Sequence, residues 1–90
     1  MATKTDKPDM PLLRAKVREV LAFAPQRKFT EAMIMDGANR MVPVPADLAA
    51  VRLAIEWNLG SGYVDYVYNR DEDRDEWFLT PRGKAKEGIK

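Results

Sequence analysis

The acidic run over residues 71–76 is the part of the chain whose residue types and spacing most resemble a metal site. Asp71, Asp73 and Asp75 alternate like the first, third and fifth ligands of a calcium-binding EF-hand loop. The rest of that loop is missing, because Glu76 stands where the loop needs glycine and Arg82 where it needs a bidentate glutamate. The sequence therefore predicts a solvated acidic loop and no metal site.

The composition excludes most kinds of catalytic and metal-binding site. The 90 residues include no cysteine and no histidine, which removes thiol nucleophiles, disulfides, thiolate and imidazole metal ligands and the usual general base at neutral pH. With 46% hydrophobic and 32% charged residues, the chain falls in the range of ordinary globular domains. We therefore expect a binding protein, not an enzyme, that uses no cofactor.

Charge is unevenly distributed along the chain. The net charge is +1 overall, but residues 1–58 carry nine basic and seven acidic side chains, residues 59–79 two and six, and residues 80–90 four and one. A nucleic-acid-binding face would have to avoid the acidic middle block, since phosphates repel carboxylates.

Hydrophobic spacing predicts three helices that would position these side chains. The first begins after Asp9 as N-cap and stops before Pro25, and the second begins at Thr30, another N-capping residue. Gly37 weakens the second half of that helix. The third is expected from about Pro45 or Ala46 to the Gly60-Ser61-Gly62 stop, and it is apolar on two sides.

A β-hairpin is expected to follow the helices. Residues 63–68 are rich in aromatic and branched side chains and predict a strand, residues 77–79 are its expected partner, and the polar residues 69–76 would connect them. We predict a flexible arm over residues 1–8, one domain over 9–83 and a basic tail over 84–90 with room for a short helix. No signal peptide and no membrane-spanning run is evident, which favours a cytoplasmic protein.

The order of these elements resembles the winged helix-turn-helix superfamily over roughly residues 10–85. Gly62-Tyr63-Val64 is similar to the Gly-Leu-Val by which such domains pass from the third helix to the wing. Phe78-Leu79-Thr80-Pro81-Arg82-Gly83 is similar to their closing strand. The resemblance implies an α+β fold, with three helices followed by a two-stranded hairpin wing. The short length also looks like the small winged-helix proteins of prophages.

The resemblance implies that the third helix reads double-stranded DNA and that the wing contacts its backbone, as in a small transcriptional regulator acting as a dimer. The candidate DNA-binding residues are Arg27, Lys28, Thr30, Arg40, Arg52 and Asn58. Two features depart from the family pattern: the third helix has a single arginine, and residues 69–76 hold five acids and two arginines.

A second reading fits the same fold. Ala49, Leu53 and Trp57 recur every four residues and would form an apolar strip on the third helix. Such a strip is either covered by a partner protein or second subunit, or, for Trp57, packed on the chain's own wing. Tyr63, Tyr66 and Tyr68 are better explained by core and cross-strand packing than by stacking on bases. The sequence thus leaves DNA binding and protein interaction open, with DNA binding preferred by the resemblance.

Overall fold

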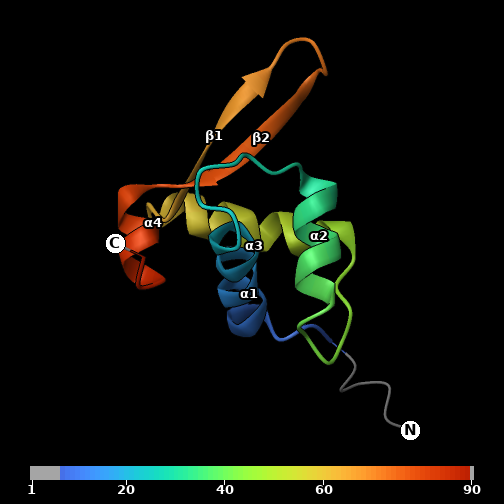
Figure 1. The fold of residues 1–90 in the computed structure, drawn as a ribbon. Helices are drawn as coiled ribbons and strands as arrows, with labels where there is room; N and C mark the ends of the chain where they lie inside the picture. The colour runs from blue at the N-terminus through green and yellow to red at the C-terminus, as the bar shows by residue number, and fades with distance from the viewer. Residues whose placement is uncertain (1–6, 90) are drawn as a thin grey trace, which may run out of the picture.

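The computed structural model describes residues 7–89 and has the expected α+β architecture (Figure 1). Helices α1 (Met10–Ala22), α2 (Glu31–Asn39) and α3 (Leu48–Gly60) precede an antiparallel hairpin, and a short helix follows it. The hairpin strands are β1 (Val64–Asn69) and β2 (Arg74–Leu79), and the last helix is α4 (Pro81–Lys86). The predicted arm over residues 1–8 lies mostly outside the described residues.

Side-chain caps determine where the helices begin. Asp9 accepts a hydrogen bond from the Leu12 amide at 3.2 Å, and Thr30 accepts one from the Met33 amide at 3.2 Å, so both predicted N-caps are confirmed. The third helix begins later than predicted because Asp47 caps it, accepting from the Ala50 amide at 2.9 Å.

Gly37 does not shorten α2 as its low helix propensity suggested. The helix continues to Asn39, and a Cβ at position 37 would lie 2.9 Å from Val20 Cγ2 on α1. The missing side chain therefore lets α1 and α2 pack closely, and this contact offsets the propensity cost. Helix propensity depends on each residue type alone, so it does not predict a contact between two helices.

The hairpin is longer than the sequence suggested. Its ladder extends to the Asn69 and Arg74 pair, so only residues 70–73 form the connection, where residues 69–76 were predicted. Polar side chains support the extra pairs: Asn69 accepts from the backbone amides of Asp71 and Glu72 and donates to Glu76 Oε2 at 3.1 Å. Asp73 takes a left-handed conformation with φ 51°, which Asp tolerates in turns.

The hairpin gains a third strand position that the sequence does not predict. Phe29, in the connector before α2, pairs with Trp77 of β2 through two backbone hydrogen bonds of 2.8 Å. A single extended residue leaves no alternating pattern to detect. The resulting order of helix, bridge, two helices and hairpin is consistent with a winged-helix-like fold.

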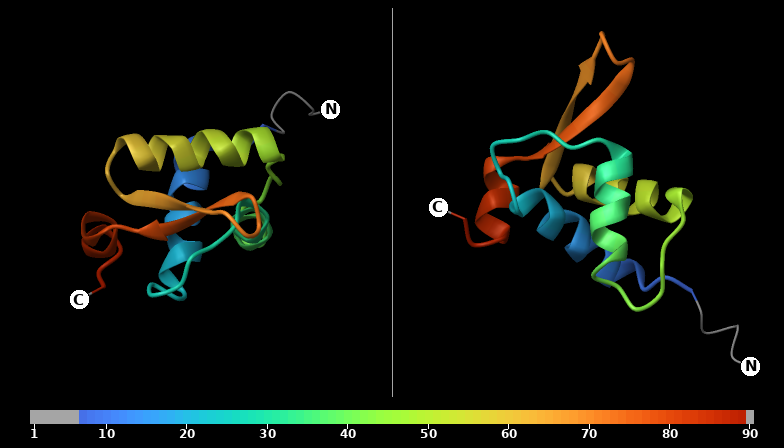
Figure 2. Two further views of the ribbon diagram at one scale, coloured as in Figure 1. Left: turned by 90° about the horizontal axis from the view of Figure 1, so that it is seen from above. Right: turned by 45° about the vertical axis from the view of Figure 1, so that its right-hand side comes forward.

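The core lies where α1, α2 and α3 meet beneath the base of the hairpin (Figures 1 and 2). It contains apolar residues of α1 and one side of α3. The fully buried members with the largest side chains are Leu13, Val17, Leu21, Ile34, Val51, Ile55 and Val64, with the polar Asn58 among them. The hairpin projects away from this core, so its tip is surrounded by solvent.

The short helix for which the basic tail had room begins at Pro81, before the predicted start of the tail, with Thr80 as its cap. The Thr80 hydroxyl accepts from the Gly83 amide at 3.0 Å and donates to the Gly62 carbonyl at 2.6 Å, which ties α4 to the end of α3. Gly62 has φ 81° and Gly83 packs so closely that a Cβ there would overlap the Tyr63 carbonyl oxygen. Gly62 is therefore required by its backbone conformation, and Gly83 by the space available to it. No helix within residues 7–89 has the length and apolar character needed to cross a bilayer.

Candidate functional site

The side of α3 that points away from the core carries an exposed apolar strip, formed by Ala49, Leu53 and Trp57. Leu53 is 59% exposed and Trp57 41% exposed, and Ala49 is also exposed. Seen from above, α3 runs along one edge of the molecule, with α1 and the hairpin both on the same side of it (Figure 2, left). The strip is thus on the accessible side of the helix, and the chain's own wing does not cover it.

Trp57 is held in place although much of it is exposed. The Arg14 guanidinium of α1 lies 4.7 Å from the centre of the indole, and the Tyr63 ring centre lies 6.2 Å away. Stacking of this kind restricts the ring at little entropic cost. Trp57 therefore packs on α1 and the end of α3, and presents one side of its ring to solvent as an ordered apolar surface.

Arg52, the one arginine of α3, is engaged within the chain. Its Nε and Nη2 donate to the two carboxylate oxygens of Glu31 at 2.9 and 3.1 Å, a bidentate pair that links α3 to the first turn of α2. The hydrogen bond and the charge of Glu31 raise the pKa of Arg52 above its ordinary value. Arg52, one of the candidate DNA-binding residues, thus has its charge paired and two of its N–H donors occupied by a carboxylate.

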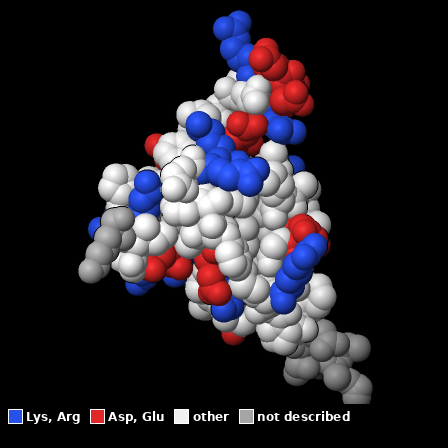
Figure 3. Space-filling model, in the orientation of Figure 1, with Lys and Arg blue, Asp and Glu red and all other residues white. Residues whose placement is uncertain are grey.

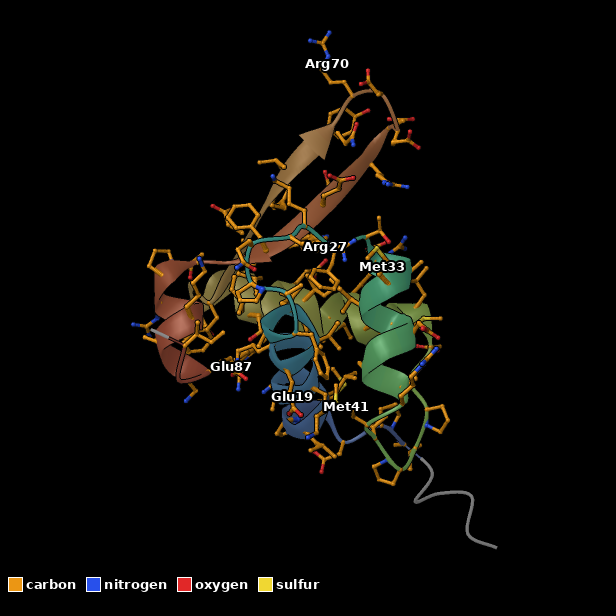
Figure 4. The ribbon with its side chains drawn as sticks, viewed as in Figure 1. Glu19, Arg27, Met33, Met41, Arg70 and Glu87 are labelled. Carbon is orange, nitrogen blue, oxygen red and sulfur yellow. The ribbon has the colours of Figure 1, made fainter. Side chains whose placement is uncertain are left out.

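Asn58 corrects the sequence prediction. It is fully buried and cannot reach a base edge. Its Oδ1 accepts from Arg18 Nη1 at 2.9 Å, and its Nδ2 donates to the carbonyls of Arg14 and Ala54 at 3.1 and 3.0 Å. Arg18 in turn donates to Glu87 Oε2 at 3.0 Å, beside α4 (Figure 4). We call Arg18, Asn58 and Glu87 the buried junction.

The buried junction was not visible in the sequence. Arg18 is only 8% exposed, although arginine is ordinarily a surface residue. Its partners are 40 and 69 residues away along the chain, so no local pattern signals the contact. Burial of a charged group is tolerated when the group is paired and hydrogen-bonded. Here Glu87 supplies the ion pair and Asn58 a further hydrogen bond.

The other predicted DNA-binding residues do not converge on the outer face of α3. Arg27 and Lys28 are exposed in the connector at the base of the hairpin, where Figure 4 labels Arg27. The Thr30 hydroxyl is used as the α2 cap. Arg40 ends α2 and pairs with Asp36 at 3.0 Å, with both side chains largely exposed. These residues are separated along α2 and are not gathered into one basic patch beside α3.

The wing is acidic at its tip. Figure 3 shows Asp and Glu side chains gathered there, with Lys and Arg side chains nearer the base of the hairpin, and Figure 4 shows Arg70 pointing away at the top. Tyr68 donates a hydrogen bond to Asp73, and this bond raises the pKa of Tyr68 above its ordinary value. The tip therefore has the charge opposite to that expected of a wing that lies on phosphates.

A groove of about 740 Å³ separates the hairpin from α2 and α3. We call it the acidic groove. Its charged lining residues are Glu31, Arg52, Glu56, Asp73, Arg74 and Asp75, and its other lining residues are Thr30, Ala32, Ile55, Leu59, Tyr66 and Trp77. The sequence does not predict this groove, because its walls come from three elements that lie far apart along the chain.

Within residues 7–89, no group of three or more Asp or Glu side chains is arranged to hold a metal ion. Comparisons of this chain with protein-family models, with curated proteins and with solved structures find no match. The likeness to winged-helix domains therefore stands on the order of the elements and on the two short stretches around Gly62 and Thr80.

Proposed function

We propose that this chain is a protein-interaction module with a winged-helix-like fold, which self-associates through the apolar strip of α3 and does not read DNA. The observation that carries the proposal is the outward face of α3. It exposes Leu53 and Trp57, and its single cation is held by Glu31. A helix that enters a DNA groove offers free donors to base edges, whereas an exposed, ordered tryptophan beside a leucine is typical of protein interfaces.

A second copy of the chain is the occupant that suits the strip. In a two-fold contact the two α3 helices run antiparallel, so Trp57 of one copy faces the small Ala49 of the other, and Leu53 lies at the centre. Large side chains then oppose small ones across the two-fold axis.

The test is the molar mass in solution, measured by light scattering over a range of concentrations. We expect a concentration-dependent dimer, with the Leu53→Lys variant raising the dissociation constant about 30-fold or more, as loss of a central interface residue does. Phe23→Lys is the matched control, because Phe23 is 78% exposed and lies at the end of α1, outside the strip. A monomer at every concentration, or equal effects of both variants, would overturn self-association.

The DNA-binding alternative makes an opposite prediction in a gel-shift experiment with a duplex at low salt. Contacts from Arg27, Lys28 and Arg40 to phosphates would produce a complex that weakens steeply as salt is added. We expect no shift. A salt-sensitive shift that is lost when Arg27 and Lys28 are replaced by glutamine would favour the DNA-binding function over the one proposed.

A further inference from the structure

We propose that the acidic groove is a second binding site, which takes a positively charged peptide segment of a partner protein. One Lys or Arg side chain of that segment would lie against Tyr66, with its charge between the carboxylates of the groove. The groove has the size of a site that takes a few side chains. It is open to solvent between α2, α3 and the hairpin, so a chain segment has access from outside.

Charge is the first argument for a cationic occupant. The groove is lined by four carboxylates, those of Glu31, Glu56, Asp73 and Asp75, and by two arginines. Both arginines are neutralised within the chain, because Arg52 pairs with Glu31 and Arg74 pairs with Glu76 at 3.3 Å.

The remaining carboxylates give the groove a net negative charge. Among residues 7–89, Glu56 and Asp75 have no ion-pair partner within 4.0 Å. A groove lined by uncompensated charge of one sign concentrates ions of the other sign. This groove therefore attracts ammonium and guanidinium groups and repels phosphates.

The aromatic pair on the hairpin is the second argument. Tyr66 and Trp77 face each other across the strands, with ring centres 4.8 Å apart and planes tilted by 43°. Tyr66 is 42% exposed while Trp77 is 7% exposed, so the tyrosine ring is the accessible one. A cation placed over an aromatic face beside carboxylates gains from both, and this combination favours a Lys or Arg side chain over an inorganic cation.

The third argument is the indole nitrogen of Trp77. Nε1 is buried and has no acceptor among the described residues. A buried donor without an acceptor costs free energy that a new hydrogen bond would recover. A peptide occupant offers backbone carbonyl oxygens, which a small ammonium compound does not. Trp77 lines the groove, so a backbone carbonyl that reached Nε1 would satisfy this donor, which favours a peptide over a small ammonium compound.

This site is separate from the self-association surface proposed above. On α3 the groove uses Arg52, Ile55, Glu56 and Leu59, whereas the apolar strip uses Ala49, Leu53 and Trp57 on the neighbouring arc of the helix. The two proposals can therefore fail independently, and the Leu53→Lys variant should bind the peptide as the wild type does.

Fluorescence polarisation of a labelled peptide, Arg-Lys-Leu-Arg-Lys, tests the inference, with a peptide in which glutamate replaces every cation as the negative control. We expect saturable binding of the basic peptide alone. Glu56→Lys combined with Asp75→Lys should raise its dissociation constant about tenfold or more, since two attractions become repulsions. Asp65→Lys combined with Asp71→Lys makes the same change of charge on the hairpin outside the groove, and should have less than about a twofold effect by the same reasoning.

A second measurement locates the peptide. Trp57→Phe leaves Trp77 as the only tryptophan, because the sequence has two, so its emission reports the groove. We expect the peptide to shift this emission, and Tyr66→Ala in that background to weaken binding. Absence of saturable binding, equal weakening by both double lysine variants, or a bound peptide that leaves Trp77 emission unchanged would each overturn the inference. Displacement of the peptide by duplex DNA would also overturn it, since the groove would then accept phosphates.

Discussion

The two sides of α3 use similar residues for opposite purposes. The inner side buries Val51, Ile55 and Asn58, and the amide oxygen of Asn58 accepts a hydrogen bond from Arg18 inside the protein. The outer side exposes Leu53 and Trp57, and its polar residue Arg52 is paired at the surface.

The difference shows that the side of α3 on which a residue lies decides whether it contributes to folding stability or to association with a partner. An amide on the inner side supports the fold, because its hydrogen bonds replace those lost to water. An apolar side chain on the outer side leaves the fold largely unaffected and offers surface to a partner. Substitutions on the inner side should therefore act on stability, and substitutions on the outer side on association.

The largest expected effect is that of Asn58→Leu. This substitution removes three hydrogen bonds and leaves Arg18 with fewer partners in a buried site, so we expect a loss of about 2–4 kcal/mol of unfolding free energy. Urea denaturation followed by circular dichroism measures it. Leu53→Asn is the matched exchange on the outer side, and it should cost less than about 1 kcal/mol. Equal losses would contradict the distinction between the two sides.

Gly83→Ala should have the next largest effect. The added methyl group would overlap the Tyr63 carbonyl and force α4 away from the end of α3, at a cost of about 1–3 kcal/mol. Gly60 is the control, since a Cβ there meets nothing within 4 Å. Gly60→Ala should leave thermal stability unchanged or raise it by up to about 1 kcal/mol. If the two alanine variants change the thermal stability equally, the close packing of α4 is not the reason that position 83 requires glycine.

A smaller effect concerns the surface pair on the outer side. In nuclear magnetic resonance spectra, the Arg52 Nε–H should exchange with water more slowly than that of Arg27, because Glu31 accepts its proton at 2.9 Å. Glu31→Gln should remove most of this protection, and the pKa of Arg52, which the Glu31 hydrogen bond raises, should fall back toward its ordinary value. Asp36→Asn, which alters the pair with Arg40 instead, is the control. Rapid exchange at Arg52 in the wild type would show that the arginine is free for a ligand.

The smallest effect is expected at the wing tip. Asp73 accepts the Tyr68 hydroxyl proton and thereby raises the pKa of Tyr68 in the folded protein. The stabilisation from this bond is present below the ordinary tyrosine pKa of about 10 and is lost as pH rises through the higher folded value. Absorbance titration of tyrosinate should show that Asp73→Asn lowers the pKa of Tyr68, with Tyr68→Phe identifying its signal. An unchanged titration would show that Asp73 does not raise the pKa of Tyr68.

The sequence by itself determined most of the order of elements. Asp9 and Thr30 predicted helix starts correctly, Gly60-Ser61-Gly62 predicted the end of α3, and the aromatic and branched residues after Gly62 predicted the first strand. These features succeed because caps, stops and strand preferences act between residues close together in the chain. Where such a local feature was overlooked, as with the Asp47 cap, the boundary was misplaced.

The tertiary structure alone decided which residues face a partner. Asn58 and Arg52 are both DNA-binding candidates from the sequence, yet Asn58 is buried with Arg18 of α1 and Arg52 is paired with Glu31 of α2. The acidic groove needs α2, α3 and the hairpin together. Each of these features depends on packing between residues that are distant in the chain. Hydrophobic periodicity predicts which side of a helix is buried, but it does not predict which residues pack against that side.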